Sequence, residues 1–237
     1  MATKLRSTLE KIHWPLLAKS VFVALLWLLA PYWVFFLCAL YFYFRPNFQS
    51  GKVAISFLVL LSLAFLAPLL QGVFAYSVAL VIGVAFYLVL GVKDLLVINR
   101  QLAYQVLRLI LLMAILLLFF WWGQSSSSQF VWQLLALFAG FFLLYYEYFS
   151  FVFEGKGAHA STAALIALLL FELAWALAWL PMGFLNASAT MLLVIFMLND
   201  FILHHFKRNL TRKIILTNFT VFAFSLLAIF LFSDWTI

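Results

Sequence analysis

Long continuous apolar segments separated by short polar ones are the dominant pattern of this chain. Most of the apolar segments are close to twenty residues long, as residues 73–92 and 214–232 illustrate. Strands of a membrane barrel alternate apolar and polar residues over about ten positions. Continuous segments of about twenty residues are instead typical of helices that cross a hydrocarbon layer roughly 30 Å thick. The pattern therefore predicts an all-α, polytopic transmembrane helix bundle, with residues 1–237 as a single integral-membrane domain.

Seven of these segments are long enough to cross a membrane once each. They lie within residues 53–233 and alternate in direction, with Gln71-Gly72 and Pro181-Met182-Gly183 as tight turns at two of the connections. Their predicted ranges are 53–71, 73–92, 107–122, 130–153, 161–180, 187–206 and 214–232.

The apolar segment at residues 15–44 contains a proline near its centre and predicts a helical hairpin. A single helix of this length would be about 45 Å long, which exceeds the hydrocarbon core. Pro31 removes a backbone donor and disfavours helical geometry at the preceding residue. We therefore expect helices at 15–30 and 32–44, which either re-enter the membrane or span it as two short helices. Residues 1–14 are expected to form a cytoplasmic amphipathic helix or a disordered tail.

Composition predicts that most of the chain lies in lipid, and the charge pattern predicts its orientation across the membrane. Of the 237 residues 68% are hydrophobic and 9% are charged, so a water-soluble fold could not cover the apolar surface. The 14 Lys and Arg side chains lie in clusters between the apolar segments, and Arg100 and Arg108 belong to one cluster. A single threading puts all of them on one side, with the N-terminus inside and the C-terminus outside.

The same charge pattern predicts the location and the partners. The net charge of +7 is explained by this inside bias, so no nucleic acid is expected as a partner. Short connections and the lack of a soluble domain indicate a multi-pass protein of a bacterial inner (plasma) membrane. The expected partners are membrane lipids and other membrane proteins or a second copy of the chain.

Small residues recur along the second long segment and predict a helix contact. Ala75, Ala79 and Gly83 are spaced four residues apart and so share one helical face. Helices in lipid approach closely where such residues meet, so this face is a predicted packing seam within the chain or against a partner.

Several polar side chains lie inside the predicted spans. Each is costly to bury in lipid unless a local interaction stabilises it. Glu172 is in the middle of residues 161–180, flanked by aromatic residues. Asp200 and His204 are four residues apart, so they share a helical face and could hydrogen-bond. The inner ends of three helices offer the following candidates: Glu147, Glu154, His159, Asn199, Asp200, His204 and His205.

Three functions compete for these residues. In the first they hydrogen-bond between helices or reach the cytoplasmic headgroups, Glu172 is protonated or paired inside the bundle, and the chain is a non-enzymatic membrane subunit or scaffold. In the second, Glu172 with Asn199 and Asp200 lines the path of a small permease or channel for a proton, cation or small polar solute. In the third, the carboxylates and histidines form a metal or acid–base site of an intramembrane lipid-processing enzyme.

The sequence gives little support to the catalytic interpretation. The carboxylate and histidine spacing is not that of HExxH, and adjacent His204 and His205 point in different directions on a helix. The sequence also lacks a P-loop, GxGxxG, GxSxG and CxxC. We therefore predict no cofactor and no metal site, and we take the subunit or scaffold as the working function.

Overall fold

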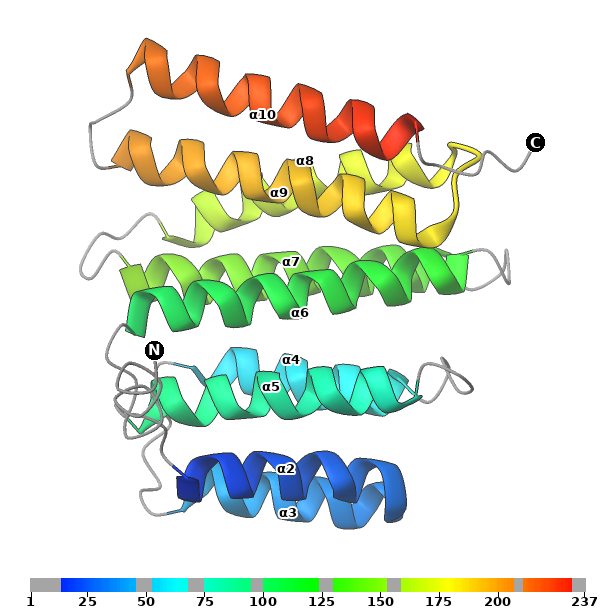
Figure 1. The fold of residues 1–237 in the computed structure, drawn as a ribbon, viewed down its shortest axis with the longest axis vertical. Coiled ribbons are helices and arrows are strands. Elements are labelled where there is room, and N and C mark those ends of the chain that lie inside the picture. The colour runs from blue at the N-terminus through cyan, green and yellow to red at the C-terminus, as the bar shows by residue number, and fades with distance from the viewer. Residues whose placement is uncertain are drawn as a thin grey trace, which may run out of the picture. The chain divides into compact units, whose positions relative to one another are not determined.

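The computed structural model describes residues 14–45, 53–67, 75–94, 100–123, 130–152, 159–206 and 211–231. These residues form nine helices and no strand (Figure 1), which confirms the all-helical prediction. The helices are α2 (Trp14–Leu29), α3 (Tyr32–Phe44), α4 (Ala54–Leu66), α5 (Ala75–Lys93), α6 (Arg100–Gly123), α7 (Phe130–Val152), α8 (His159–Ala178), α9 (Phe184–Phe206) and α10 (Arg212–Leu231).

Five of the described helices are long and apolar enough to cross a membrane. They are α5, α6, α7, α8 and α9. Helices α2, α3 and α4 are shorter, as is the apolar part of α10 at Ile215–Leu231, and the 13 residues of α4 extend about 20 Å against a hydrocarbon core of roughly 30 Å. Helix length and composition fix neither the number of spans nor the direction, so the seven-span count and the orientation stay predictions. Residues 1–13 of the predicted tail at 1–14 and the Gln71-Gly72 turn lie outside the described residues, and Trp14 is the first residue of α2.

The chain divides into two compact units. The first comprises Met1–Leu111 with Glu147–Gly155, and the second comprises Leu112–Tyr146 with Lys156–Ile237. Both boundaries within the described residues fall inside helices, so α6 and α7 each contribute one part to each unit.

In the first unit, α2 and α3 form a hairpin that breaks at Ala30 and Pro31 (Figure 1). Pro31 has an extended backbone, with φ −57° and ψ 144°, and its carbonyl accepts the first N–H bond of α3 at 2.9 Å from Val34. Across the hairpin the rings of Phe22 and Phe42 meet edge to face, 6.0 Å apart. The break therefore occurs where proline lacks a donor and restricts the residue before it.

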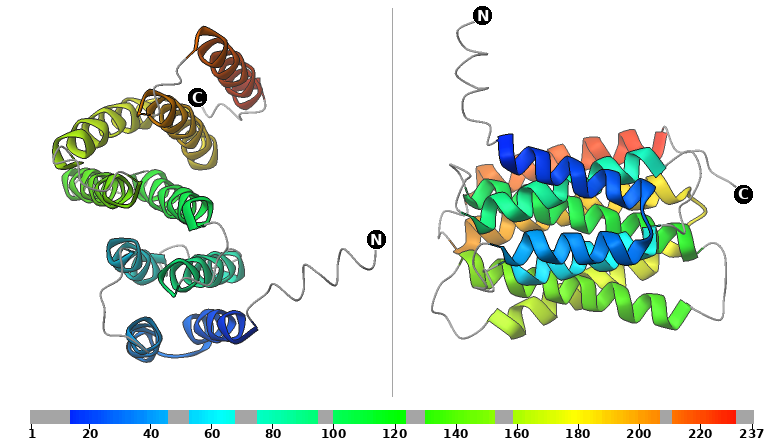
Figure 2. Two further views of the ribbon diagram at one scale, coloured as in Figure 1. Left: turned by 90° about the vertical axis from the view of Figure 1, so that its left-hand side faces the viewer. Right: turned by 90° about the horizontal axis from the view of Figure 1, so that it is seen from below.

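Helices α2 and α5 of the first unit pack against each other (Figure 2). At Gly83 an added Cβ would lie 3.1 Å from the Cβ of Ala24 and 3.6 Å from the carbonyl oxygen of Ser20. Ala79, one turn earlier, is buried, and Ala75 is half-buried. The structure thus places Gly83 at a close approach to α2 within the chain, and the packing role of Ala75 and Ala79 stays a prediction.

In the second unit, α8 connects to α9 through a turn at residues 179–183, and α9 lies beside α10 (Figure 2). One face of α8 is buried, and its members are Ala163, Ala167, Leu170 and Ala174. The ring of Phe171 meets that of Phe138 from α7 edge to face, 6.1 Å apart. Helix α10 is exposed over most of its length, so its attachment depends on the contacts with α9.

Candidate functional site

Glu147 is a buried carboxylate that caps the start of another helix. It lies near the end of α7 and is 2% exposed. One carboxylate oxygen accepts the backbone N–H of Ile55 at 2.9 Å, and the other accepts that of Ser56 at 3.0 Å. These N–H groups belong to the first turn of α4, where no intrahelical acceptor exists and the helix dipole favours negative charge. The N-cap residue Val53 supplies no side-chain cap, and Glu147, 92 residues after Ile55 in the sequence, accepts these N–H groups instead.

Two hydroxyl groups complete the surroundings of the same carboxylate. The Ser56 hydroxyl donates to Oε2, and the Tyr104 hydroxyl from α6 donates to the same oxygen at 3.0 Å. Ser56 and Tyr104 are both fully buried. The four donors come from α4 and α6, while the acceptor comes from α7. Glu147 therefore connects three helices of the first unit through hydrogen bonds.

A buried cation lies one turn beyond Tyr104 on the same face of α6. Arg108 is 1% exposed, and its guanidinium carbon lies 3.6 Å from the ring centroid of Tyr148. The rings of Tyr148 and Tyr104 are parallel, with centroids 6.5 Å apart. A guanidinium over an aromatic face is stabilised by the ring's electron density, more so away from water. The charge pattern assigns Arg108 to an inner cluster of cations, and the structure adds that this side chain is packed between helices.

Other cations of the first unit donate hydrogen bonds to carbonyl groups at helix ends. The Lys93 ammonium donates to the carbonyl oxygen of Tyr43, in the last turn of α3, and lies 4.6 Å from the centre of the Tyr43 ring. Arg100 donates to the carbonyl oxygen of Val92, in the last turn of α5, at 3.1 Å. Last-turn carbonyls lack intrahelical donors and carry the negative end of the dipole. These basic residues therefore stabilise helix ends.

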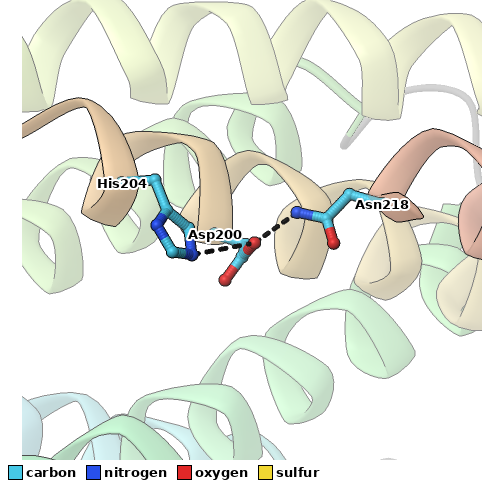
Figure 3. A network of polar contacts seen from close by, with 3 residues as sticks. All are labelled: Asp200, His204 and Asn218. Atoms are coloured by element: carbon cyan, nitrogen blue, oxygen red, sulfur yellow. Dashed lines mark hydrogen bonds and ion pairs between the residues drawn. The ribbon is translucent and has the colours of Figure 1, made fainter. Parts of the chain in front are cut away.

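In the second unit, Asp200 connects α9 to α10. The side-chain amide of Asn218 donates to Oδ2 of Asp200, and Nε2 of His204 lies 3.7 Å from the same oxygen (Figure 3). This separation is beyond hydrogen-bonding distance but within ion-pair range if the imidazole is protonated. Asp200 and His204 are each about one third exposed. The carboxylate thus lies at the α9–α10 contact, with His204 one turn away on α9.

Asn199 hydrogen-bonds to α7, whereas its neighbour Asp200 hydrogen-bonds to α10. It is 7% exposed, and its Oδ1 accepts the hydroxyl of Tyr145 from α7 at 3.0 Å. Adjacent residues on a helix point about 100° apart, so one polar pair contacts two different neighbours of α9. Asn199 and Asp200 therefore act at separate helix contacts of the second unit.

The remaining candidates lie apart from these contacts. Glu172 is exposed on α8, and His159, the first residue of α8, is half-buried. Glu154 and the side chain of His205 lie outside the described residues. Within the described part of the chain, no three His, Cys, Asp or Glu side chains are grouped to hold a metal ion.

The sequence interpretation missed the partners of these polar groups. It did not select Ser56, Tyr104, Tyr145 or Asn218. One signal was present: Tyr104 and Arg108 are four residues apart, so a hydroxyl and a cation share a helical face. The first-turn position of Ser56 in its helix was a second signal.

Comparison of the chain with protein-family models, with curated proteins and with solved structures finds no match. The residues of the chain and their contacts are therefore the basis for its functional interpretation.

Proposed function

We propose that this chain is a non-enzymatic subunit or scaffold of a membrane, which packs against lipids and other membrane proteins. The hydrogen-bond surroundings of Glu147 are the main support for this proposal. Glu147 is 2% exposed and, among the described residues, its carboxylate accepts from two backbone N–H groups and two hydroxyls. A carboxylate that conducts a proton or activates a substrate needs access to that proton or substrate. Glu147 instead has the surroundings of a structural acceptor.

The polar contacts of the second unit support the same function. Asn199 bonds to Tyr145 on α7, and Asp200 bonds to Asn218 on α10. Each contact joins two helices, which is the usual role of isolated polar side chains within membrane helix bundles. Such contacts give a stable framework without a reactive centre.

The charge pattern supports a specific placement. We infer seven spans plus the α2–α3 hairpin, with the N-terminus inside and the C-terminus outside, in a bacterial inner (plasma) membrane. The clusters of Lys and Arg between the apolar segments favour this direction and an attraction to anionic lipids of the inner leaflet.

Two measurements on the purified full-length chain test the proposed function. In sealed lipid vesicles it is expected to cause no more proton or potassium uptake than vesicles without protein, and to release no product from the vesicle lipids. Extracted from its own membrane in native lipid discs, it is expected in an assembly heavier than its own 27.2 kDa.

Uptake that is lost in Glu172→Gln would show a permease. Lipid turnover that is lost in Asp200→Asn would show an enzyme. A monomer in the discs would also contradict the proposal.

A further inference from the structure

The exposed side of α8 carries a regular stripe with one acidic residue. Leu165, Leu168, Glu172, Trp175 and Trp179 follow one another at intervals of three and four residues, and all five are exposed. The first four lie on α8, and Trp179 is the first residue of the turn that follows it. This is the spacing of the seam by which two helices pack along each other. Exposure reaches 68% at Leu165 and 75% at Trp179. We call these five residues the α8 seam.

The α8 seam lies on the side of the helix that the chain itself does not cover. The buried positions of α8 are Ala163, Ala167, Leu170 and Ala174. At 100° per residue, Glu172 points almost directly away from the mean direction of these four. The internal packing of α8 therefore leaves the α8 seam available for a second helix.

Glu172 makes this surface different from one that merely faces lipid. It lies six residues before the end of α8, which corresponds to about 9 Å of helix, farther than a glutamate side chain can reach. Among the described residues no hydrogen bond or ion pair to its carboxylate is found. A charged group at such depth is costly unless a partner compensates it.

The compensating group does not come from the described part of this chain. Its Lys and Arg residues lie near helix ends or are buried, as Lys19 in the second turn of α2 and Arg108 show. A second copy docked by two-fold symmetry would bring one Glu172 against the other, and like charges repel. Charge complementarity therefore favours a helix of a different protein with a basic residue in its membrane span.

We propose that the α8 seam docks a transmembrane helix of another protein, which places a Lys or Arg side chain against Glu172. This inference rests on the proposed subunit function and names the chemistry of the partner. The leucine and tryptophan side chains supply the apolar contact, and the ion pair sets the register, as single polar residues do in coiled coils.

A designed helix of known composition tests the docking. A benzoyl-phenylalanine photo-crosslinker replaces Leu168 in the full-length protein, which is reconstituted in uncharged phosphatidylcholine vesicles. The probes are leucine–alanine transmembrane peptides of about 20 residues with lysine, leucine or glutamate at the centre. The lysine peptide is expected to be captured about tenfold more than the leucine peptide.

Glu172→Leu is expected to remove the difference in capture between the two peptides, and Glu172→Gln to reduce it. A crosslinker at exposed Leu80 on α5 is the matched control and should show no preference.

Three results would overturn the proposal. Equal capture of the lysine and leucine peptides would mean that the α8 seam faces lipid. Capture of the glutamate peptide as efficient as that of the lysine peptide would remove the need for a cation. Crosslinks from Leu168 to a second copy of this chain, without peptide capture, would assign the seam to a homo-oligomer. If docking fails while the chain remains in a heavier assembly in native discs, the subunit function stands and only this surface is misassigned.

Discussion

Glu147 and Glu172 are chemically identical side chains with opposite surroundings. Glu147 is enclosed by donors from α4 and α6, whereas Glu172 is exposed on the side of α8 opposite its buried face. Removal of Glu147 should therefore affect folding, because the donors it satisfies would stay buried without an acceptor.

Glu147→Leu is expected to lower the free energy of unfolding by about 3 kcal/mol, since two backbone N–H groups and two hydroxyls lose their acceptor. Ser56→Ala removes one donor and should cost about 1 kcal/mol. Unfolding by dodecyl sulfate in mixed micelles measures both. The control is Ser62→Ala, on the same helix, because the Ser62 hydroxyl is exposed and bonds only to Leu58 of its own helix. Equal stability of the Ser56 and Ser62 variants would contradict the assigned role of Glu147.

For individual residues, the sequence indicates which polar side chains lie within helices but not their hydrogen-bond partners. Asp200 and His204 share a face because their spacing is local. The bond from Asn218 to Asp200, and those from Ser56 and Tyr104 to Glu147, join residues that are distant in the sequence. Their pairing depends on how helices are packed, which a single sequence does not specify.

Among the elements, local rules predict helix breaks better than helix contacts. Pro31 separates α2 from α3 within one residue of the expected position, because proline acts on its own peptide group and that of its neighbour. The small residues of α5 predict a close helix approach, but the choice of α2 as the neighbour depends on the tertiary arrangement.

Gly83→Leu is expected to separate α5 from α2 and to lower the free energy of unfolding by about 2 kcal/mol, because the added side chain begins 3.1 Å from the Cβ of Ala24. Gly183→Leu is the matched control, since a Cβ at Gly183 meets nothing within 4 Å, and it should cost less than about 1 kcal/mol. The same dodecyl sulfate titration measures both variants. A Gly83→Leu protein as stable as the original would refute the close approach.

Asn218→Leu is expected to loosen α10 from α9, because the side-chain amide of Asn218 donates to Asp200 across that contact. A polar contact between membrane helices is worth about 1 kcal/mol, so amide hydrogen exchange in α10 should become several-fold faster. Thr220→Val is the control, because the Thr220 hydroxyl bonds to Leu216 within α10 itself. Unchanged exchange in the Asn218 variant would show that other contacts hold α10.

For the whole molecule, composition predicts a helical membrane protein because the hydrophobic effect and backbone hydrogen bonding act on every residue. The orientation of the chain across the membrane depends on a weaker signal, the positions of Lys and Arg between the apolar segments. A cysteine at Ser126, introduced after replacement of Cys38 by serine, is expected to react with an impermeant maleimide in intact cells. A cysteine at Asn209 should react only after permeabilisation. The reverse pattern would invert the predicted orientation.

We propose that the carboxylates within the predicted spans of this chain serve structure and assembly. The most direct test measures the unfolding free energy of Glu172→Leu together with the mass of its complex in native lipid discs. We expect stability within about 0.5 kcal/mol of the original protein, since the side chain is exposed, and a shift from the heavier assembly to the 27.2 kDa monomer. A variant that loses stability, or that remains in the assembly, would contradict a role of Glu172 in assembly.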